Sequence, residues 1–128
     1  FGFEMGMKWI DSKEEMIAAA GWSTLASLAS IKTDDTLDID AYSALLDRVE
    51  KNIHNAQNRV RYTMNGFVIS VGSYISGLTD KANLTATAIG KVSVSMGNTA
   101  CKVPLAKDYI KKVADKNRIG KKRKQARR

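Results

Sequence analysis

Apolar residues recur three and four positions apart along most of the chain, which is the spacing of one buried helical face. The longest run of this kind extends from about Ala56 to Ile75. Its predicted buried positions are Val60, Met64, Phe67, Val68, Val71, Tyr74 and Ile75. Residues 67–71 are rich in branched side chains and could also form a strand. The apolar stripe continues on both sides of them, so we prefer a helix.

Two glycines interrupt this predicted helix. Gly66 and Gly72 lie in its interior, where each costs about 1 kcal/mol of helix stability relative to alanine. A helix that contains interior glycines despite this cost suggests that another helix approaches its backbone closely. We therefore expect a close helix–helix contact at both positions.

Five shorter segments also show helical patterns, and each opens on a residue that commonly starts a helix. The predicted starts are Ser12, Ser23, either Asp38 or Asp40, Thr79 and Pro104. Ser12 and Glu15 have the spacing of a capping box. Gly21 and Gly90 follow as helix stops. Between residues 91 and 103 apolar positions alternate instead, which predicts a short extended or hairpin excursion.

The chain is therefore predicted to be all-α, with consecutive helices forming antiparallel pairs. Such pairs build α-solenoids, whose repeats can differ in sequence, but they also build closed bundles, and periodicity does not separate the two. We expect a helical domain over residues 1–117 and a basic, disordered tail over residues 118–128. Because the chain opens on Phe1 rather than Met, we also expect a fragment of a longer protein.

The charge is unevenly distributed along the chain. The 128 residues include 21 Lys and Arg and 13 Asp and Glu, which gives a net charge of +8. Twelve basic but only two acidic residues lie from Lys102 to Arg128, so this segment carries +10 and the remainder −2. Such asymmetry points to a nucleic acid or an acidic membrane surface. A solvated tail that aids solubility explains the charge equally well.

Some of the basic residues are candidates for contact with DNA phosphates. Arg59 and Arg61 form the dense basic pair outside the C-terminal segment, at the start of the longest predicted helix. The free N–H groups of a helix start favour anions, although pairing with Asp47 or Glu50 is an equal alternative. The predicted DNA-phosphate contacts are Arg59, Arg61, Lys102, Arg118, Lys121, Lys122, Arg123, Lys124, Arg127 and Arg128.

Aromatic side chains offer a second kind of nucleic-acid contact. Trp9 and Trp22 could stack on a nucleobase or a sugar, because flat aromatic faces do so without sequence preference. Aromatic residues at helical spacing more often belong to the core. For these two residues we therefore favour a place in the core over stacking on a nucleic acid.

The sequence gives little support for a catalytic site or a metal site. A single His and a single Cys exclude a His-rich metal centre and a disulfide framework. Cys101 and His54 lie far apart in sequence, and we expect a small packed thiol and a helix-terminal imidazole. The carboxylates at 34, 35, 38 and 40 are better explained by helix capping and loop charge than by calcium binding. We expect no metal and no cofactor.

A membrane-spanning or exported chain is not expected. The longest apolar stretch, residues 66–72, is far shorter than the ~20 residues that cross a bilayer. The chain shows no signal-peptide pattern at its start, so we expect a cytoplasmic location.

Several stretches resemble the DNA alkylation repair (AlkD-like) family. They cover residues 59–74, 89–104, 109–113 and 120–124. The specific parts are Met-Asn-Gly-Phe-Val-Ile at 64 to 69 and Thr-Ala-Cys-Lys-Val-Pro at 99 to 104, which are typical of one branch of the family rather than of its best-known glycosylases. The resemblance spans roughly residues 9–124.

This resemblance implies a HEAT-like α-α superhelix with a concave, basic surface that cradles duplex DNA. Well-studied family members release N3- or N7-alkylated purines with an Asp, aromatic residues and a supporting Arg. No position here matches the Asp motif, and Trp22 lacks the expected following arginine, so no catalytic residue is carried over. We expect the C-terminal DNA-binding part of a DNA alkylation repair protein. The alternative is a non-catalytic helical-repeat module that binds nucleic acid or a protein.

Overall fold

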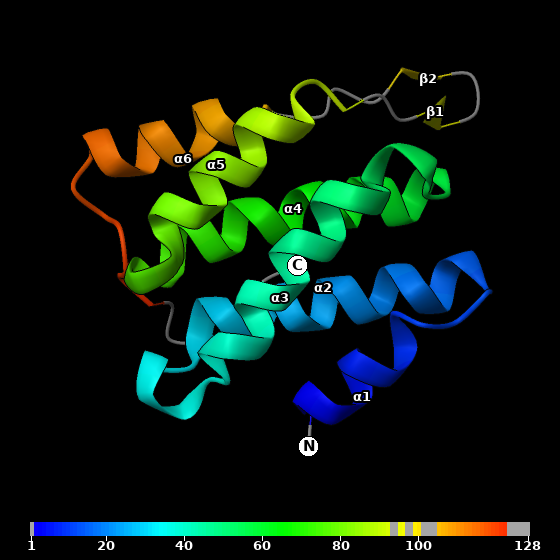
Figure 1. Ribbon diagram of the computed structural model, residues 1–128, viewed down its shortest axis with the longest axis horizontal. Coiled ribbons are helices and arrows are strands. Elements are labelled where there is room, and N and C mark those ends of the chain that lie inside the picture. The colour runs from blue at the N-terminus through cyan, green and yellow to red at the C-terminus, as the bar shows by residue number, and fades with distance from the viewer. Residues whose placement is uncertain (1, 93–94, 97–98, 101–104, 123–128) are drawn as a thin grey trace.

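The structure is a computed structural model that describes residues 2–92, 95–96, 99–100 and 105–122. The described residues form six α-helices, α1 (Gly2–Trp9), α2 (Glu15–Ile31), α3 (Ile39–Asn52), α4 (Asn58–Tyr74), α5 (Thr79–Ile89) and α6 (Ala106–Asp115) (Figure 1). Three 3₁₀ turns connect them, η1 (Asp34–Thr36), η2 (Ile53–Asn55) and η3 (Ser76–Leu78). The all-α prediction is confirmed. Within this part of the chain, no helix is both long and apolar enough to cross a membrane.

The predicted excursion after α5 contains a short hairpin. Strand β1 (Ser95–Met96) pairs antiparallel with β2 (Thr99–Ala100), and Ser95 lies opposite Ala100. The hairpin prediction is confirmed for these four residues, and positions 93–94, 97–98 and 101–104 lie outside the described residues.

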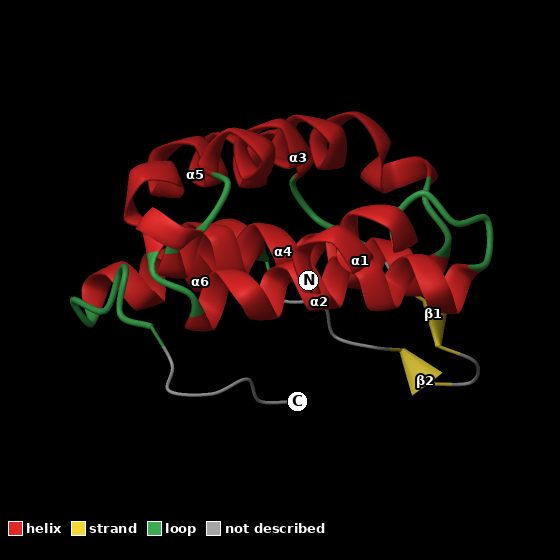
Figure 2. Cartoon of the chain, turned by 90° about the horizontal axis from the view of Figure 1, so that it is seen from below, coloured by secondary structure: helices red, strands yellow, loops and turns green. Residues whose placement is uncertain are grey.

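The helices form two layers (Figure 2). One layer holds α3 and α5, and the other holds α2, α4 and α6 side by side. In Figure 1, α2, α4 and α6 all run from right to left, and α3 and α5 return from left to right. This alternation of antiparallel pairs, with equivalent helices parallel in one layer, is the arrangement of an α-solenoid. We call α2, α4 and α6 the inner helices.

The core between the layers centres on three aromatic rings. Trp22 meets Phe67 edge to face at 5.1 Å between ring centroids, and Tyr42 stacks on Phe67 at 5.6 Å. All three side chains are fully buried. The Tyr42 hydroxyl donates to the Leu25 carbonyl at 2.7 Å, and burial raises the pKa of this phenol. These contacts join α2, α3 and α4.

Helix α2 differs from the prediction of two helices that meet at Gly21. It runs unbroken through Gly21, where an added Cβ would lie 2.8 Å from the Ile10 nitrogen and 2.9 Å from the Gly6 carbonyl oxygen. The glycine is therefore needed for the close crossing of α1, a helix that the sequence pattern did not predict. The capping box is also wrong, because the Ser12 hydroxyl accepts from the Glu14 N–H and Glu14 is the N-cap.

The two glycines of α4 have different surroundings. A Cβ at Gly72 would lie 2.5 Å from Ile110 Cδ1 and 3.1 Å from the Ala82 Cβ, so the predicted close contact is confirmed there. At Gly66 a Cβ would meet nothing within 4 Å. The prediction of a neighbouring helix at Gly66 is therefore wrong.

Substituting alanine for Gly21 is expected to destabilise the protein. The new methyl group would collide with backbone atoms of α1, which cannot rotate away as a side chain can. Overpacking of this kind costs about 1–3 kcal/mol of unfolding free energy, which urea denaturation measures. The control is Gly77→Ala, because a Cβ there meets nothing within 4 Å. Equal stability of the two variants would contradict the α1–α2 crossing.

Candidate nucleic-acid interface

The solvent-facing side of the inner helices carries a groove of about 810 Å³. Each helix lines it with residues spaced three or four apart, because such residues share one face. Helix α2 contributes Ser23, Ala26, Ser27 and Ser30, and α4 contributes Tyr62, Thr63, Gly66, Ile69, Ser70, Ser73 and Tyr74. Small side chains therefore make up most of the groove floor along α2 and α4.

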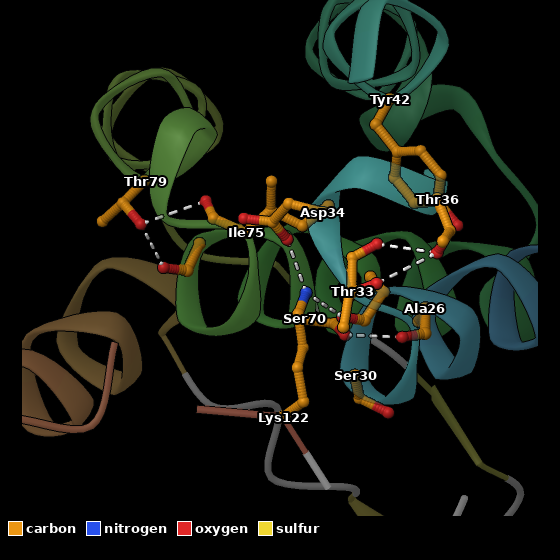
Figure 3. Close-up of polar contacts among 12 residues, drawn as sticks. Ala26, Ser30, Thr33, Asp34, Thr36, Tyr42, Ser70, Ile75, Thr79 and Lys122 are labelled. Carbon is orange, nitrogen blue, oxygen red and sulfur yellow. Dashed lines mark hydrogen bonds and ion pairs between the residues drawn. The ribbon is translucent and has the colours of Figure 1, made fainter. Parts of the chain in front are cut away.

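Hydroxyl groups hold this floor together. The Ser70 hydroxyl donates to the Ala26 carbonyl at 2.7 Å, which links α4 to α2 across the floor (Figure 3). Within α2, the Ser30 hydroxyl donates to the Ser27 carbonyl at 2.7 Å. Both hydroxyls already have acceptors inside the protein, and the Ser70 bond helps to set the spacing of α2 and α4.

Positive charge lines the side of the groove formed by α6 and the residues that follow it. The basic lining residues are Lys112, Lys116, Arg118, Lys121 and Lys122. Tyr109 and Val113 accompany them on the same face of α6. None of the described lining residues carries a carboxylate. The groove therefore presents a positive surface of one sign, as an anionic ligand requires.

Residues 116–122 form a strap that continues from α6 across the ends of the other inner helices. Asn117 ends α6 in a left-handed conformation with φ of 56°, and the Arg118 N–H returns to the Val113 carbonyl at 3.0 Å, as in a Schellman cap. The Gly120 N–H then donates to the Ser73 carbonyl at 2.8 Å. The strap is thus fastened to α4.

Lys122 fastens the strap to α2. Its Nζ donates to the Ala29 carbonyl at 2.9 Å and pairs with Asp34 Oδ1 at 2.7 Å (Figure 3). Its side chain is only 16% exposed. Because the inner helices are parallel, their C-terminal ends lie together, and a cation there offsets the partial negative charge of the helix dipoles. Residues 118–122 are thus bound to the helices rather than disordered, which corrects the predicted boundary at 118.

The predicted phosphate site at the start of α4 is already filled by the protein. The Arg59 N–H donates to Glu15 Oε2 at 2.9 Å, so a carboxylate of α2 takes the place of an anion. The Arg61 guanidinium donates to the Ala56 carbonyl at 2.9 Å. Asp47, one of the proposed alternative partners, pairs with Lys81 at 3.0 Å. Neither arginine lines the groove.

The remaining predicted phosphate contacts fall into three groups. Arg118 and Lys121 line the groove with exposed side chains. Lys122 also lines it, but its charge is paired with Asp34. The others, Lys102, Arg123, Lys124, Arg127 and Arg128, lie outside the described residues.

The aromatic prediction is corrected by burial. Trp22 is fully buried beside Phe67, and Arg48 lies 5.8 Å from its ring centroid, so Trp22 cannot stack on a base. Trp9 ends α1, away from the groove lining. The groove instead exposes Tyr62 and Tyr109, whose exposed fractions are 42% and 45%.

The other polar candidates have structural roles. Asp38 is the N-cap of α3 and accepts from the Ala41 N–H at 3.0 Å, which confirms capping as its role. His54 Nε2 donates to the Ile89 carbonyl at 2.8 Å just after α3, as expected of a helix-terminal imidazole. Cys101 lies outside the described residues.

Sequence reasoning missed Lys112, Lys116 and the two tyrosines as site residues. The signal was present in their spacing, since positions 109, 112, 113 and 116 lie on one face of a helix. Ile110, which is fully buried, packs against Gly72 of α4 and so orients α6.

Removing the charge of Lys122 is expected to loosen the strap. Lys122→Met keeps the length of the side chain but loses the contacts to Ala29 and Asp34. The amide of Gly120 should then exchange with solvent about fivefold faster, because local opening becomes easier. Hydrogen-exchange mass spectrometry measures this rate. Lys121→Met changes the exposed neighbour as a control, and equal exchange in the two variants would refute the fastening role.

Comparisons with known proteins agree with this fold. No family model matches the chain. The uncharacterized protein Lin0241 of Listeria innocua is 38% identical over 112 residues, which cover 88% of this chain and 46% of the relative. The uncharacterized protein Lmo0209 of Listeria monocytogenes is 36% identical over 110 residues, which cover 86% and 46%. The chain thus spans about half the length of these relatives.

One solved structure matches nearly the whole chain. It is described as a new family of proteins related to the HEAT-like repeat DNA glycosylases with affinity for branched DNA structures. The match has a TM-score of 0.89 at 31% identity and covers 96% of this chain and 52% of that one. The resemblance predicted from sequence is confirmed, because the chain has a HEAT-like helical fold and is similar over nearly its whole length to a protein related to the HEAT-like repeat DNA glycosylases.

Proposed function

We propose that the protein binds DNA in the groove of its inner helices. The observation that carries the proposal is the cationic lining, in which five side chains are basic and none of the described lining residues is acidic. One of the five, Lys122, is paired with Asp34, which does not line the groove. Lys112, Lys116, Arg118 and Lys121 would contact phosphates and release the counterions bound to them, which drives sequence-independent binding. Lys122 would add positive charge to the groove from its position at the end of the strap, where it is bonded to α2.

The arrangement of charge favours DNA over an acidic protein partner. A helical-repeat module for proteins is the alternative, and scattered cations would have supported it. Instead five of the seven Lys and Arg residues between 106 and 122 line one groove, and the other two are Lys107 and Lys111. The structural relative is described as having affinity for branched DNA, and we extend the proposal to branched as well as duplex DNA.

Neutralising the groove face of α6 is expected to weaken binding. In the double variant Lys112→Ala and Lys116→Ala, affinity for a fluorescein-labelled 20-bp duplex should fall about tenfold near 100 mM salt. The slope of log K against log salt should become shallower by about 2, one for each lost phosphate contact. Fluorescence anisotropy across a salt series measures both, and a four-way junction carrying the same label is tested in parallel.

The same helix supplies a matched control. Lys107 and Lys111 are exposed on α6 but do not line the groove, so Lys107→Ala with Lys111→Ala makes the same change in net charge. We expect this variant to keep nearly the wild-type slope. Equal effects of the two double variants would contradict groove binding, and Arg59→Ala tests the sequence-based prediction for the start of α4.

A second proposed function is excision of alkylated purines by a protein of the relatives' full length. The relation to the HEAT-like repeat DNA glycosylases favours it. The described groove lining offers no carboxylate for that chemistry. This chain would then supply the DNA contact, and other residues would act on the base.

Release of methylated bases tests this second function. A protein of the relatives' full length is incubated with duplex DNA that contains N3-methyladenine and N7-methylguanine, and free bases are separated by chromatography. Excision predicts release that grows with time and protein concentration. Binding without release would rule out excision while leaving DNA binding in place.

A further inference from the structure

Gly66 has no packing role inside the protein. The interior glycines Gly6, Gly21 and Gly72 each allow a close contact, because an added Cβ would lie 3.0 Å or less from a neighbouring helix residue or the residue after a helix. Gly66 is also interior to its helix, yet a Cβ there would meet nothing within 4 Å. A glycine lowers helix stability relative to alanine, so its position on the groove floor calls for another explanation.

A polar side chain on the same floor lacks a partner. Ser73 lines the groove seven residues after Gly66, on the same face of α4. Its side chain is buried, with 2% of the residue exposed, and its hydroxyl has no hydrogen-bond partner among the described residues. The neighbouring hydroxyl of Ser70 is already bonded to the Ala26 carbonyl. A buried hydroxyl without an acceptor is unfavourable, and an acceptor brought by a ligand would satisfy it.

We infer that the sugar–phosphate backbone of the bound DNA seats directly on the surface of α4 between Gly66 and Ser73. This inference rests on the proposed DNA binding and adds the contact that sets how deep the DNA lies. Without a Cβ at Gly66, ligand atoms can approach the helix backbone closely. The Ser73 hydroxyl donates to a phosphate oxygen, while the basic residues of α6 and the strap hold the neighbouring phosphates.

The open space at Gly66 makes stability and affinity separable. Gly66→Ala and Gly66→Leu should both raise the melting temperature, by about 4 °C, because they improve helix propensity without a clash. Affinity for the labelled 20-bp duplex should fall as the side chain grows, about twofold to threefold for alanine and about tenfold or more for leucine. A merely structural glycine would not lose affinity while gaining stability.

Two further variants control for bulk and test the hydroxyl. Ala88→Leu introduces the same leucine side chain at an exposed position of α5, outside the groove, and should leave affinity unchanged. Ser73→Ala removes the unpartnered hydroxyl, so we expect about a threefold loss of affinity without a loss of melting temperature.

The outcomes separate this inference from the function on which it rests. If the wild-type protein binds neither the duplex nor the four-way junction at low salt, the proposed DNA binding fails. If the wild-type protein binds DNA and Gly66→Leu binds it equally well, seating on α4 is overturned while DNA binding stands. Unchanged affinity in Ser73→Ala would remove the hydroxyl from the contact.

Discussion

The packing of Phe67 between Trp22 and Tyr42 determines which face of the inner helices is exposed to solvent. The three rings come from α4, α2 and α3, and the ring centroids of Trp22 and Tyr42 lie 5.1 and 5.6 Å from that of Phe67. Their burial sets the rotation of α4 about its own axis. Once Phe67 points into the core, Gly66 is turned about 100° away from it around the helix, and Ser70 lies on the same face as Gly66 because it follows four residues later. The groove floor is thus a consequence of the aromatic core.

The strap brings positive charge to this floor. The residues before Lys102 carry a net charge of −2, so the positive charge of the groove comes from α6 and the strap. Three contacts hold the strap beside the groove floor. The Arg118 N–H caps α6, the Gly120 N–H donates to α4, and Lys122 donates to α2. The cations thereby lie beside the C-terminal ends of three parallel helices, where the dipoles favour them. The same residues stabilise the fold and give the groove its charge.

The sequence predicted what depends on local periodicity. It identified α4, the cap at Asp38 and the close contact at Gly72, because each follows from residues near one another along the chain. The predicted buried stripe is also correct except at Tyr74, which is half-buried and lines the groove. It did not identify what depends on distant segments. Gly21 looked like a helix stop because α1 could not be seen to cross there. Arg59 looked like a phosphate site because Glu15, 44 residues earlier, could not be placed at the same helix start. The groove itself combines α2, α4 and α6, so its lining could not be assigned before the helices were packed.

The central claim is that DNA contacts the groove face of the inner helices, and a residue-by-residue map of that contact tests it most directly. Amide signals of the ¹⁵N-labelled protein would be followed by NMR as an unlabelled 20-bp duplex is added. The account predicts that signals of residues 62–73, 109–113 and 116–122 shift together and saturate, while those of the outer helices α3 and α5 stay in place. Shifts concentrated on α3 and α5, or around Arg59 at the start of α4, would contradict it.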